Sequence, residues 1–146
     1  MDKPDNNQQI LLAEDDKDDV LLFEIAIESL PFAVLLTVAE DGERLMALLE
    51  SIFPDIIFLD IHMPCKSGRE CIQEIRANPR FDSIPVIMYT SFKFEEYIDE
   101  TYRNGANFYM IKPNNIDALA KKIKILLEMD WKNYMYYPPK ELYVIA

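Results

Sequence analysis

The sequence predicts an α/β protein, a (βα)5 doubly wound domain built on a five-stranded parallel sheet. Half of the 146 residues are apolar, which suffices for one compact core, and the chain is too short for two ordinary domains. Five short apolar runs are continuous and lack the polar alternation of a half-exposed strand. Strands buried on both faces of a parallel sheet have this pattern. The segments between the runs show helical periodicity.

The expected strands follow the apolar runs in chain order. They cover residues 10–13, 32–39, 56–59, 84–89 and 106–111. The expected helices lie between and after them, near residues 17–30, 41–50, 68–77 and 93–104, and each ends close to a Pro, Gly or polar break.

The fifth helix is the clearest. After a cap at Asn114 or Asn115, apolar residues recur at three- and four-residue steps, namely Ile116, Leu119, Ile123 and Leu126. At the first helix, Asp18 and Asp19 are expected to lie in the opening turn, because carboxylates favour the amino end of a helix.

The composition argues against several classes of function. A net charge of −11 repels phosphate backbones, so we expect no direct DNA binding. The basic residues Lys121, Lys122 and Lys124 are expected to form a solvated helix face. No apolar run approaches the ~18 residues of a membrane span, and the amino end does not resemble a secretory signal, so we expect a cytoplasmic protein. Cys65 and Cys71 have no metal-binding partners nearby and are expected to be free thiols.

The residues that follow the strands are chemically distinctive. In open parallel sheets, ligands bind beyond the carboxyl ends of the strands. Charged or hydroxyl side chains follow four of the five expected strands: Glu14-Asp15-Asp16, Asp60, Thr90-Ser91 and Lys112. The second strand, which ends before Glu40, contributes nothing comparable, as expected of an edge strand.

Carboxylates that converge on one rim imply a cation. They repel each other, and burial raises their pKa values unless a positive charge intervenes. Oxygen ligands without clustered His or Cys favour a hard ion, and Mg²⁺, or Mn²⁺ in its place, fits a site that also holds a phosphate. Lys112 adds a fixed positive charge. An ion and an ammonium beside a carboxylate form a receptor for phosphoryl oxygens.

Four motifs combine these strand ends with their neighbours. They are ILLAEDD at residues 10–16, FLDIHMP at 58–64 followed by Gly68, YTS at 89–91, and FYMIKP at 108–113. Together they resemble the signature of the bacterial response-regulator receiver family over residues 9–130. The resemblance implies a flavodoxin-like receiver fold and a stand-alone phosphoacceptor response regulator of a two-component or phosphorelay system. Residues 131–146 lie outside it as an aromatic C-terminal extension.

The resemblance assigns roles to the acidic residues. Asp60 is the phosphoacceptor, whose carboxylate oxygen attacks phosphorus, and it also belongs to the metal site. Asp15 matches the direct metal ligand, and Glu14 matches the neighbour that acts through metal-bound water. His62 lends only its backbone carbonyl. The acidic run can also be read one residue later, so whether Asp16 replaces Glu14 or Asp15 at the metal stays open.

The resemblance also assigns a lysine, a hydroxyl and an aromatic residue. Lys112 pairs with the phosphoryl group and bridges to Asp60, which makes Asp60, Lys112 and Thr90 the implied catalytic set. Thr90 matches the switch hydroxyl that bonds a phosphoryl oxygen, and Tyr109 matches the aromatic residue that moves inward with it. The bond from Lys112 to Pro113 resembles the family's cis peptide.

The partners follow from the same resemblance. The implied phosphodonor is a sensor histidine kinase or a phosphotransfer protein. No helix-turn-helix effector is found, so the output is expected to be contact with an unidentified downstream protein or onward phosphotransfer. A receiver phosphorylates itself without turning over an external substrate, so calling it an enzyme is a matter of definition.

Two alternative functions fit less well. A phosphatase of the haloacid-dehalogenase type needs a second Asp two residues after its nucleophile, and here that position is His62. An interaction module that acts without phosphorylation would not need the full set of acidic, hydroxyl and lysine residues at the strand ends.

The extension at residues 131–146 is too apolar for a solvated tail, since it carries Trp131 and four of the chain's eight tyrosines. Pro138 and Pro139 stop the last helix and leave a short extended end. This end can fold back on its own domain or dock on a second copy. Of the two arrangements, we predict a homodimer beside the last two helices.

Overall fold

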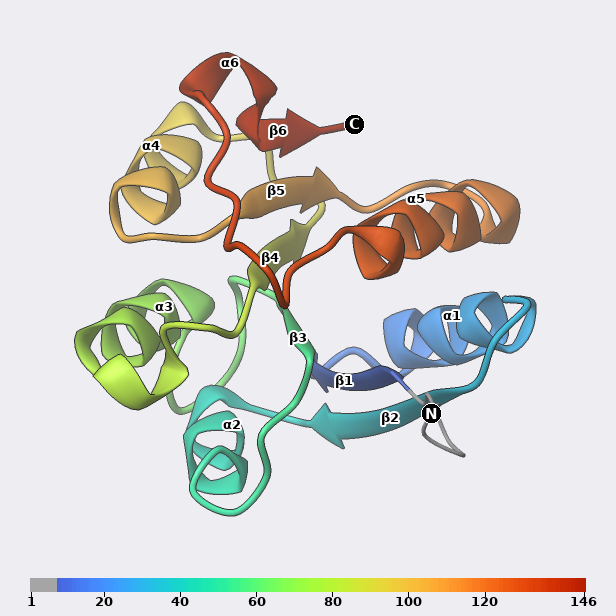
Figure 1. The fold of residues 1–146 in the computed structure, drawn as a ribbon, viewed down its shortest axis with the longest axis horizontal. Helices are drawn as coiled ribbons and strands as arrows, with labels where there is room; N and C mark the ends of the chain where they lie inside the picture. Colours follow the sequence, from blue (N-terminus) through green and yellow to red (C-terminus); the bar gives the residue numbers. More distant parts are fainter. Residues whose placement is uncertain (1–7) are drawn as a thin grey trace.

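The computed structural model describes residues 8–146 and contains a six-stranded sheet in the order β2-β1-β3-β4-β5-β6 (Figure 1). Every neighbouring pair of strands is parallel. The strands are β1 (Gln8–Ala13), β2 (Val34–Ala39), β3 (Ile56–Leu59), β4 (Val86–Thr90), β5 (Phe108–Ile111) and β6 (Val144–Ile145). The predicted α/β class and parallel sheet are confirmed.

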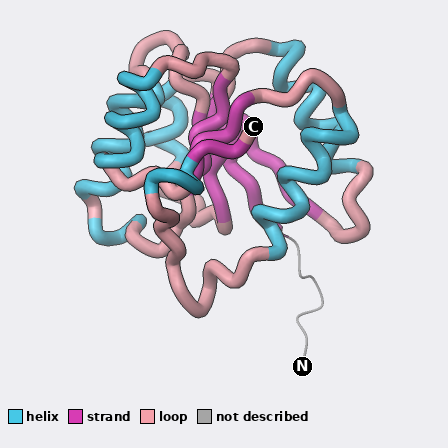
Figure 2. Tube along the Cα trace, turned by 90° about the horizontal axis from the view of Figure 1, so that it is seen from above, coloured by secondary structure: helices cyan, strands magenta, loops and turns pink. Residues whose placement is uncertain are grey.

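Helices cover both faces of the sheet, as Figures 1 and 2 show. One face carries α1 (Lys17–Glu28) and α5 (Ile116–Glu128), and the other carries α2 (Gly42–Leu48), α3 (Gly68–Ala77) and α4 (Glu95–Arg103). A 3-10 turn, η1 (Pro79–Phe81), and a short helix, α6 (Lys140–Tyr143), complete the elements. Within the described part of the chain, no helix is both long and apolar enough to cross a bilayer.

Each face of the sheet has its own apolar core. Under α1 and α5, the rings of Phe23, Phe58 and Tyr89 meet edge to face. The opposite core packs α2, α3 and α4 onto the sheet. All residues of β3 and β4 are buried, whereas β2 alternates and leaves Leu35 exposed. The difference arises because β2 is an edge strand.

Side chains fix where two helices near the strand ends begin. Asn115 caps α5, because its side chain accepts a hydrogen bond from the backbone N–H of Ala118 at 2.8 Å. Of the two predicted caps, Asn114 and Asn115, the cap is therefore Asn115. At α3, Ser67 and Glu70 form a reciprocal capping box.

The segment after α5 crosses to the other face of the sheet near the amino end of β5 (Figure 1). Two hydrogen bonds fasten the crossing. Nδ2 of Asn107 donates to the Tyr136 carbonyl at 2.7 Å, and the Tyr102 hydroxyl donates to the Pro138 carbonyl at 3.0 Å. The segment therefore packs on its own domain, one of the two predicted arrangements.

The end of the chain adds a sixth strand, which corrects the predicted five-stranded sheet. β6 pairs with β5, with Val144 opposite Tyr109 and Ile145 opposite Met110. Tyr143 is fully buried, and its hydroxyl lies 2.7 Å from the Thr101 hydroxyl. The physical reason is that β5 would otherwise present unpaired backbone groups at the sheet edge.

Candidate functional site

Three carboxylates meet beyond the carboxyl ends of β1 and β3. Ligand oxygens of Glu14, Asp15 and Asp60 all lie within 4.8 Å of one another. Backbone hydrogen bonds continue the sheet at this rim, because the Glu14 N–H donates to the Ala39 carbonyl and the Asp60 N–H donates to the Ala13 carbonyl. Glu14 and Asp60 are buried, whereas Asp15 is exposed. The cluster thus rests on the hydrogen-bonded end of the sheet and is open to solvent at Asp15.

Among the three acids, Glu14 gives the clearest indication of a cation site. Its Oε1 is buried without a hydrogen bond of good geometry, although Nζ of Lys112 lies 2.8 Å away. The pKa of Glu14 is raised to about 8: burial is the main cause, the negative charge of Asp60 adds to it, and Lys112 acts in the opposite direction. A buried carboxylate oxygen beside two other acids fits a hard divalent ion.

Lys112 is the positive group of this site. Its backbone N–H donates to the Thr90 carbonyl at 2.9 Å, and its ammonium lies close to oxygens of three carboxyl groups. The distances from Nζ are 2.7 Å to Asp19, 2.8 Å to Glu14 and 3.5 Å to Asp60. Burial lowers the pKa of Lys112, but these carboxylates outweigh it and the net pKa is raised. The ammonium therefore stays charged.

The implied cis bond from Lys112 to Pro113 is wrong, because all described peptide bonds are trans.

One carboxylate oxygen of Asp60 accepts a backbone hydrogen bond, and the other is less constrained. Oδ1 accepts a hydrogen bond from the Ile61 N–H at 2.7 Å, and Oδ2 faces Lys112. Gly68 packs against the Asp60 carbonyl, where a Cβ would lie only 2.0 Å from the oxygen. Its N–H also donates to the Ile61 carbonyl at 2.9 Å. Glycine at this position therefore permits the close approach that shapes the loop.

Asp16 stands apart from the three clustered acids. Its Oδ1 accepts hydrogen bonds from the backbone N–H groups of Asp18 and Asp19 and so caps α1. Capping satisfies helix-end donors that would otherwise lack partners. The structure brings Glu14 and Asp15 to the cluster and assigns Asp16 to the helix.

Asp19 is the site residue that sequence analysis missed. The sequence predicts its position in the first turn of α1, which the structure confirms, but it does not predict the contact with Lys112. Its position in the first turn of α1, directly after the rim residues Glu14 and Asp15, places Asp19 near the rim but does not identify Lys112 as its partner.

Thr90 and Tyr109 both contact the loop that follows β4. The Thr90 hydroxyl oxygen accepts from the Phe92 N–H at 3.2 Å, and the Tyr109 hydroxyl donates to the Phe92 carbonyl at 2.6 Å. Both side chains are fully buried. Thr90 and Tyr109 thus bind both backbone polar groups of Phe92, its N–H and its carbonyl.

The His62 side chain is exposed and packs on aromatic rings. Its ring centroid lies 4.4 Å from that of Phe92 and 5.5 Å from that of Tyr97. It is not among the clustered metal-ligating side chains of the described residues. The imidazole thus packs against the loop after β4 and against α4.

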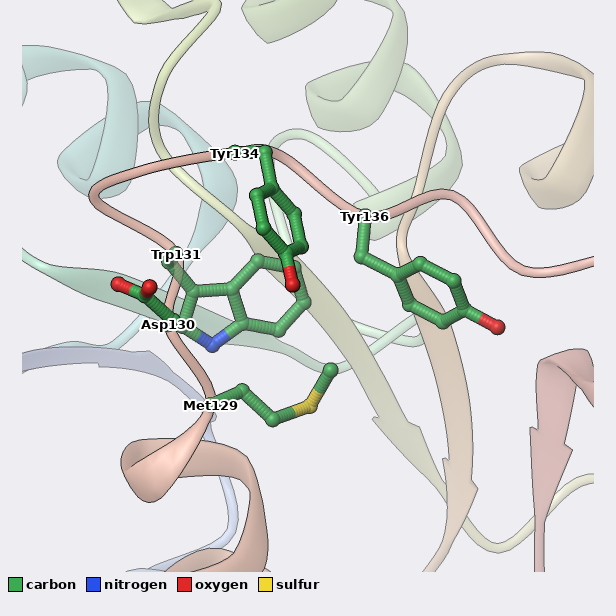
Figure 3. Close-up of a pocket in the computed structure, with 5 residues that line it drawn as sticks. All are labelled: Met129, Asp130, Trp131, Tyr134 and Tyr136. Atoms are coloured by element: carbon green, nitrogen blue, oxygen red, sulfur yellow. The ribbon is translucent and has the colours of Figure 1, made fainter.

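The chain also has a cavity at the start of the extension, with a volume of about 260 Å³. Figure 3 shows its lining side chains, which are Met129, Asp130, Trp131, Tyr134 and Tyr136. None of them belongs to the acidic cluster. The cavity is separate from the chemistry at the strand ends.

The acids at the rim could hold a divalent ion, and a carboxylate oxygen of Asp60 lies beside a charged ammonium. Such an arrangement stabilises charge that develops on transferring phosphoryl oxygens. Nearby His or Cys ligands that would favour a soft metal are not found in the cluster among residues 8–146.

Comparisons with known proteins agree with this geometry. Residues 10–124 match the family described as the response regulator receiver domain. The response regulator Rcp1 of Synechocystis sp. is 33% identical over 122 residues, which cover 79% of this chain and 83% of that protein.

Two solved structures resemble the whole fold. The Mn(2+)-bound form of response regulator Rcp1 has a TM-score of 0.75 and 31% identity, covering 90% of this chain and 99% of that chain. The phosphorylated cyanobacterial phytochrome response regulator RcpA has a TM-score of 0.77 and 30% identity, covering 84% of this chain and 92% of that chain.

Proposed function

Because the chain belongs to the response regulator receiver family of two-component systems, we propose that it accepts a phosphoryl group on Asp60. The donor is a sensor histidine kinase or a phosphotransfer protein. The observation that carries the proposal is that Asp60 belongs to a cluster of three acids and lies beside the Lys112 ammonium. The phosphorylated protein then switches a surface that contacts a downstream protein.

The chemistry assigned to the site is an in-line transfer. An Asp60 carboxylate oxygen forms a bond to phosphorus while the bond from phosphorus to the donor's histidine nitrogen breaks. Lys112 stabilises charge on the phosphoryl oxygens. Glu14, Asp15, Asp60 and the backbone carbonyl of His62 would hold the divalent ion, Mg²⁺ or Mn²⁺. When bound, this ion neutralises the crowded negative charge.

Switching is assigned to Thr90 and Tyr109. Their shared contact with Phe92 supports this role, because a Thr90 hydroxyl drawn to the phosphoryl group gives up its bond to the Phe92 N–H. The loop after β4 then changes its conformation, and Tyr109 moves with it. A receiver-like module that acts without phosphorylation is not favoured by any of these contacts.

The test uses purified protein with a small phosphodonor, such as phosphoramidate, and Mg²⁺. We expect the intact mass to increase by one phosphoryl group that is labile in base. Asp60→Asn or an added chelator should abolish the increase. Undiminished labelling of Asp60→Asn would overturn the proposal.

A further inference from the structure

Asp19 contacts the lysine of the acidic cluster, although no motif assigns it a role. Its Oδ2 lies 2.7 Å from Nζ of Lys112, whereas Oδ2 of Asp60 lies 3.5 Å from the same atom. The Asp19 side chain is 30% exposed and that of Lys112 is 11% exposed. The ion pair therefore lies at the mouth of the site, between the first turn of α1 and the end of β5.

Within this pair, Asp19 is the fixed partner and Lys112 is the movable one. The cap formed by Asp16 accepts from the Asp19 backbone N–H at 3.1 Å and holds the first turn of α1. A short aspartate on a fixed turn has a narrow range of carboxylate positions. Lysine carries its ammonium on a flexible four-carbon stem. A change in anionic partners at the site therefore moves the lysine.

Several acidic groups compete for the Lys112 ammonium. It has three N–H donors, and its two short contacts are with Asp19 and Glu14. A phosphoryl group on Asp60 would bring about −1.5 to −2 charges and three acceptor oxygens. Asp19 is the carboxylate outside the metal cluster that competes with such a group.

We propose that Asp19 is a positioning residue for Lys112. It holds the ammonium away from Asp60 before phosphorylation and competes for it afterwards. This inference rests on the proposed phosphorylation of Asp60. It predicts that removing the Asp19 charge changes the affinities for beryllium fluoride and for Mg²⁺ in opposite directions.

In Asp19→Asn, beryllium fluoride, a mimic of the phosphoryl group, should bind more tightly at saturating Mg²⁺. The variant loses both a competitor for Lys112 and a negative charge near the mimic. We expect a gain of about threefold to tenfold, the size of one partly screened charge interaction. Mg²⁺ alone should bind more weakly by a similar factor, because the released ammonium pairs with Asp60. General damage to the site would weaken both.

Three control variants isolate the role of Asp19. Asp18→Asn makes the same charge change at an exposed position in the same turn and should alter both affinities by less than about twofold. Asp19→Glu keeps a carboxylate within reach and should resemble the wild type. In a Lys112→Met background, Asp19→Asn should change the Mg²⁺ affinity no more than Asp18→Asn does.

Calorimetric titration of the full chain, first with Mg²⁺ and then with beryllium fluoride at saturating Mg²⁺, measures both affinities. Opposite shifts in Asp19→Asn support the inference. Unchanged affinities, or losses in both, overturn it while leaving Asp60 as the phosphoacceptor. Failure of the wild type to bind beryllium fluoride would instead refute the proposed function.

Discussion

Glu14 links the stability of the protein to pH. Burial raises its pKa to about 8 in the folded state, against an ordinary value of 4.5. The folded, metal-free protein thus keeps a proton that the unfolded chain has already lost at neutral pH. This contribution favours the native state fully below about pH 4.5 and is lost as the pH rises through about 8.

We therefore expect the free energy of unfolding of the metal-free protein to fall between about pH 5 and pH 8, by an amount on the order of a few kcal/mol. Glu14→Gln should remove most of this fall. Millimolar Mg²⁺ should raise the Tm more at pH 8 than at pH 5, because the ion binds the ionised native cluster. Thermal unfolding with and without chelator measures these effects. A Tm insensitive to Mg²⁺ near neutral pH would count against the metal site.

The proposed role of Thr90 is to respond to the phosphoryl group that Asp60 accepts. We expect Thr90→Ala to accept the group at a reduced rate and to lose the phosphorylation-dependent change over residues 93–127. Amide hydrogen exchange of the free and phosphorylated forms measures that change. Ser91→Ala, which alters the adjacent exposed hydroxyl, serves as the control. A wild-type response in Thr90→Ala would remove Thr90 from the switch.

The sequence was most informative about residues that directly follow strands. Asp60 and Lys112 could be placed at one rim because parallel strands bring their carboxyl ends together. The ion pair of Asp19 with Lys112 could not be foreseen, because the two residues are separated by 93 positions and meet only through side-chain conformation. The cap formed by Asp16 likewise depends on backbone geometry at the start of α1.

At the scale of elements, the central strands β3 and β4 were predictable because helices on both faces bury their side chains continuously. β6 was not predictable, because a two-residue strand has no periodicity of its own. Its position is determined by the open edge of β5 and by the burial of Tyr143. The preceding crossing depends on side-chain hydrogen bonds that no local pattern reveals.

Asn107 holds this crossing to the sheet. Its Oδ1 accepts from the Val86 N–H and from Arg76, each at 2.9 Å, and its Nδ2 donates to the Tyr136 carbonyl. We expect Asn107→Ala to lower the free energy of unfolding by about 2–4 kcal/mol, because it leaves buried partners unsatisfied. Chemical denaturation measures the loss.

Asn133→Ala is the matched control for Asn107→Ala. Its exposed side chain donates a hydrogen bond only to Asp130, and its removal should cost less than about 0.5 kcal/mol. Equal losses in the two variants would contradict the role of Asn107 in holding the extension.

At the scale of the whole molecule, the homodimer stays a prediction. The extension packs on its own domain, yet Leu142 in α6 and Val144 in the edge strand β6 are exposed at 58% and 38%. We expect light scattering to show concentration-dependent dimers of the full chain, and Leu142→Lys to shift them toward monomers. Leu35→Lys, on the opposite edge strand, should leave association unchanged. A protein that stays monomeric at high concentration, phosphorylated or not, would rule the dimer out.

The carboxyl ends of β1, β3, β4 and β5 bring acids, a hydroxyl and a lysine to one rim of the sheet, and the proposed function places a single phosphoacceptor there. The most direct test is to locate the phosphoryl group after reaction with a small phosphodonor and Mg²⁺. Reduction of the acyl phosphate with borohydride followed by peptide mass spectrometry identifies the modified residue. We predict modification at Asp60 alone, and none when a chelator is present. Modification at Asp15 or Asp19 with Asp60 untouched would contradict this assignment.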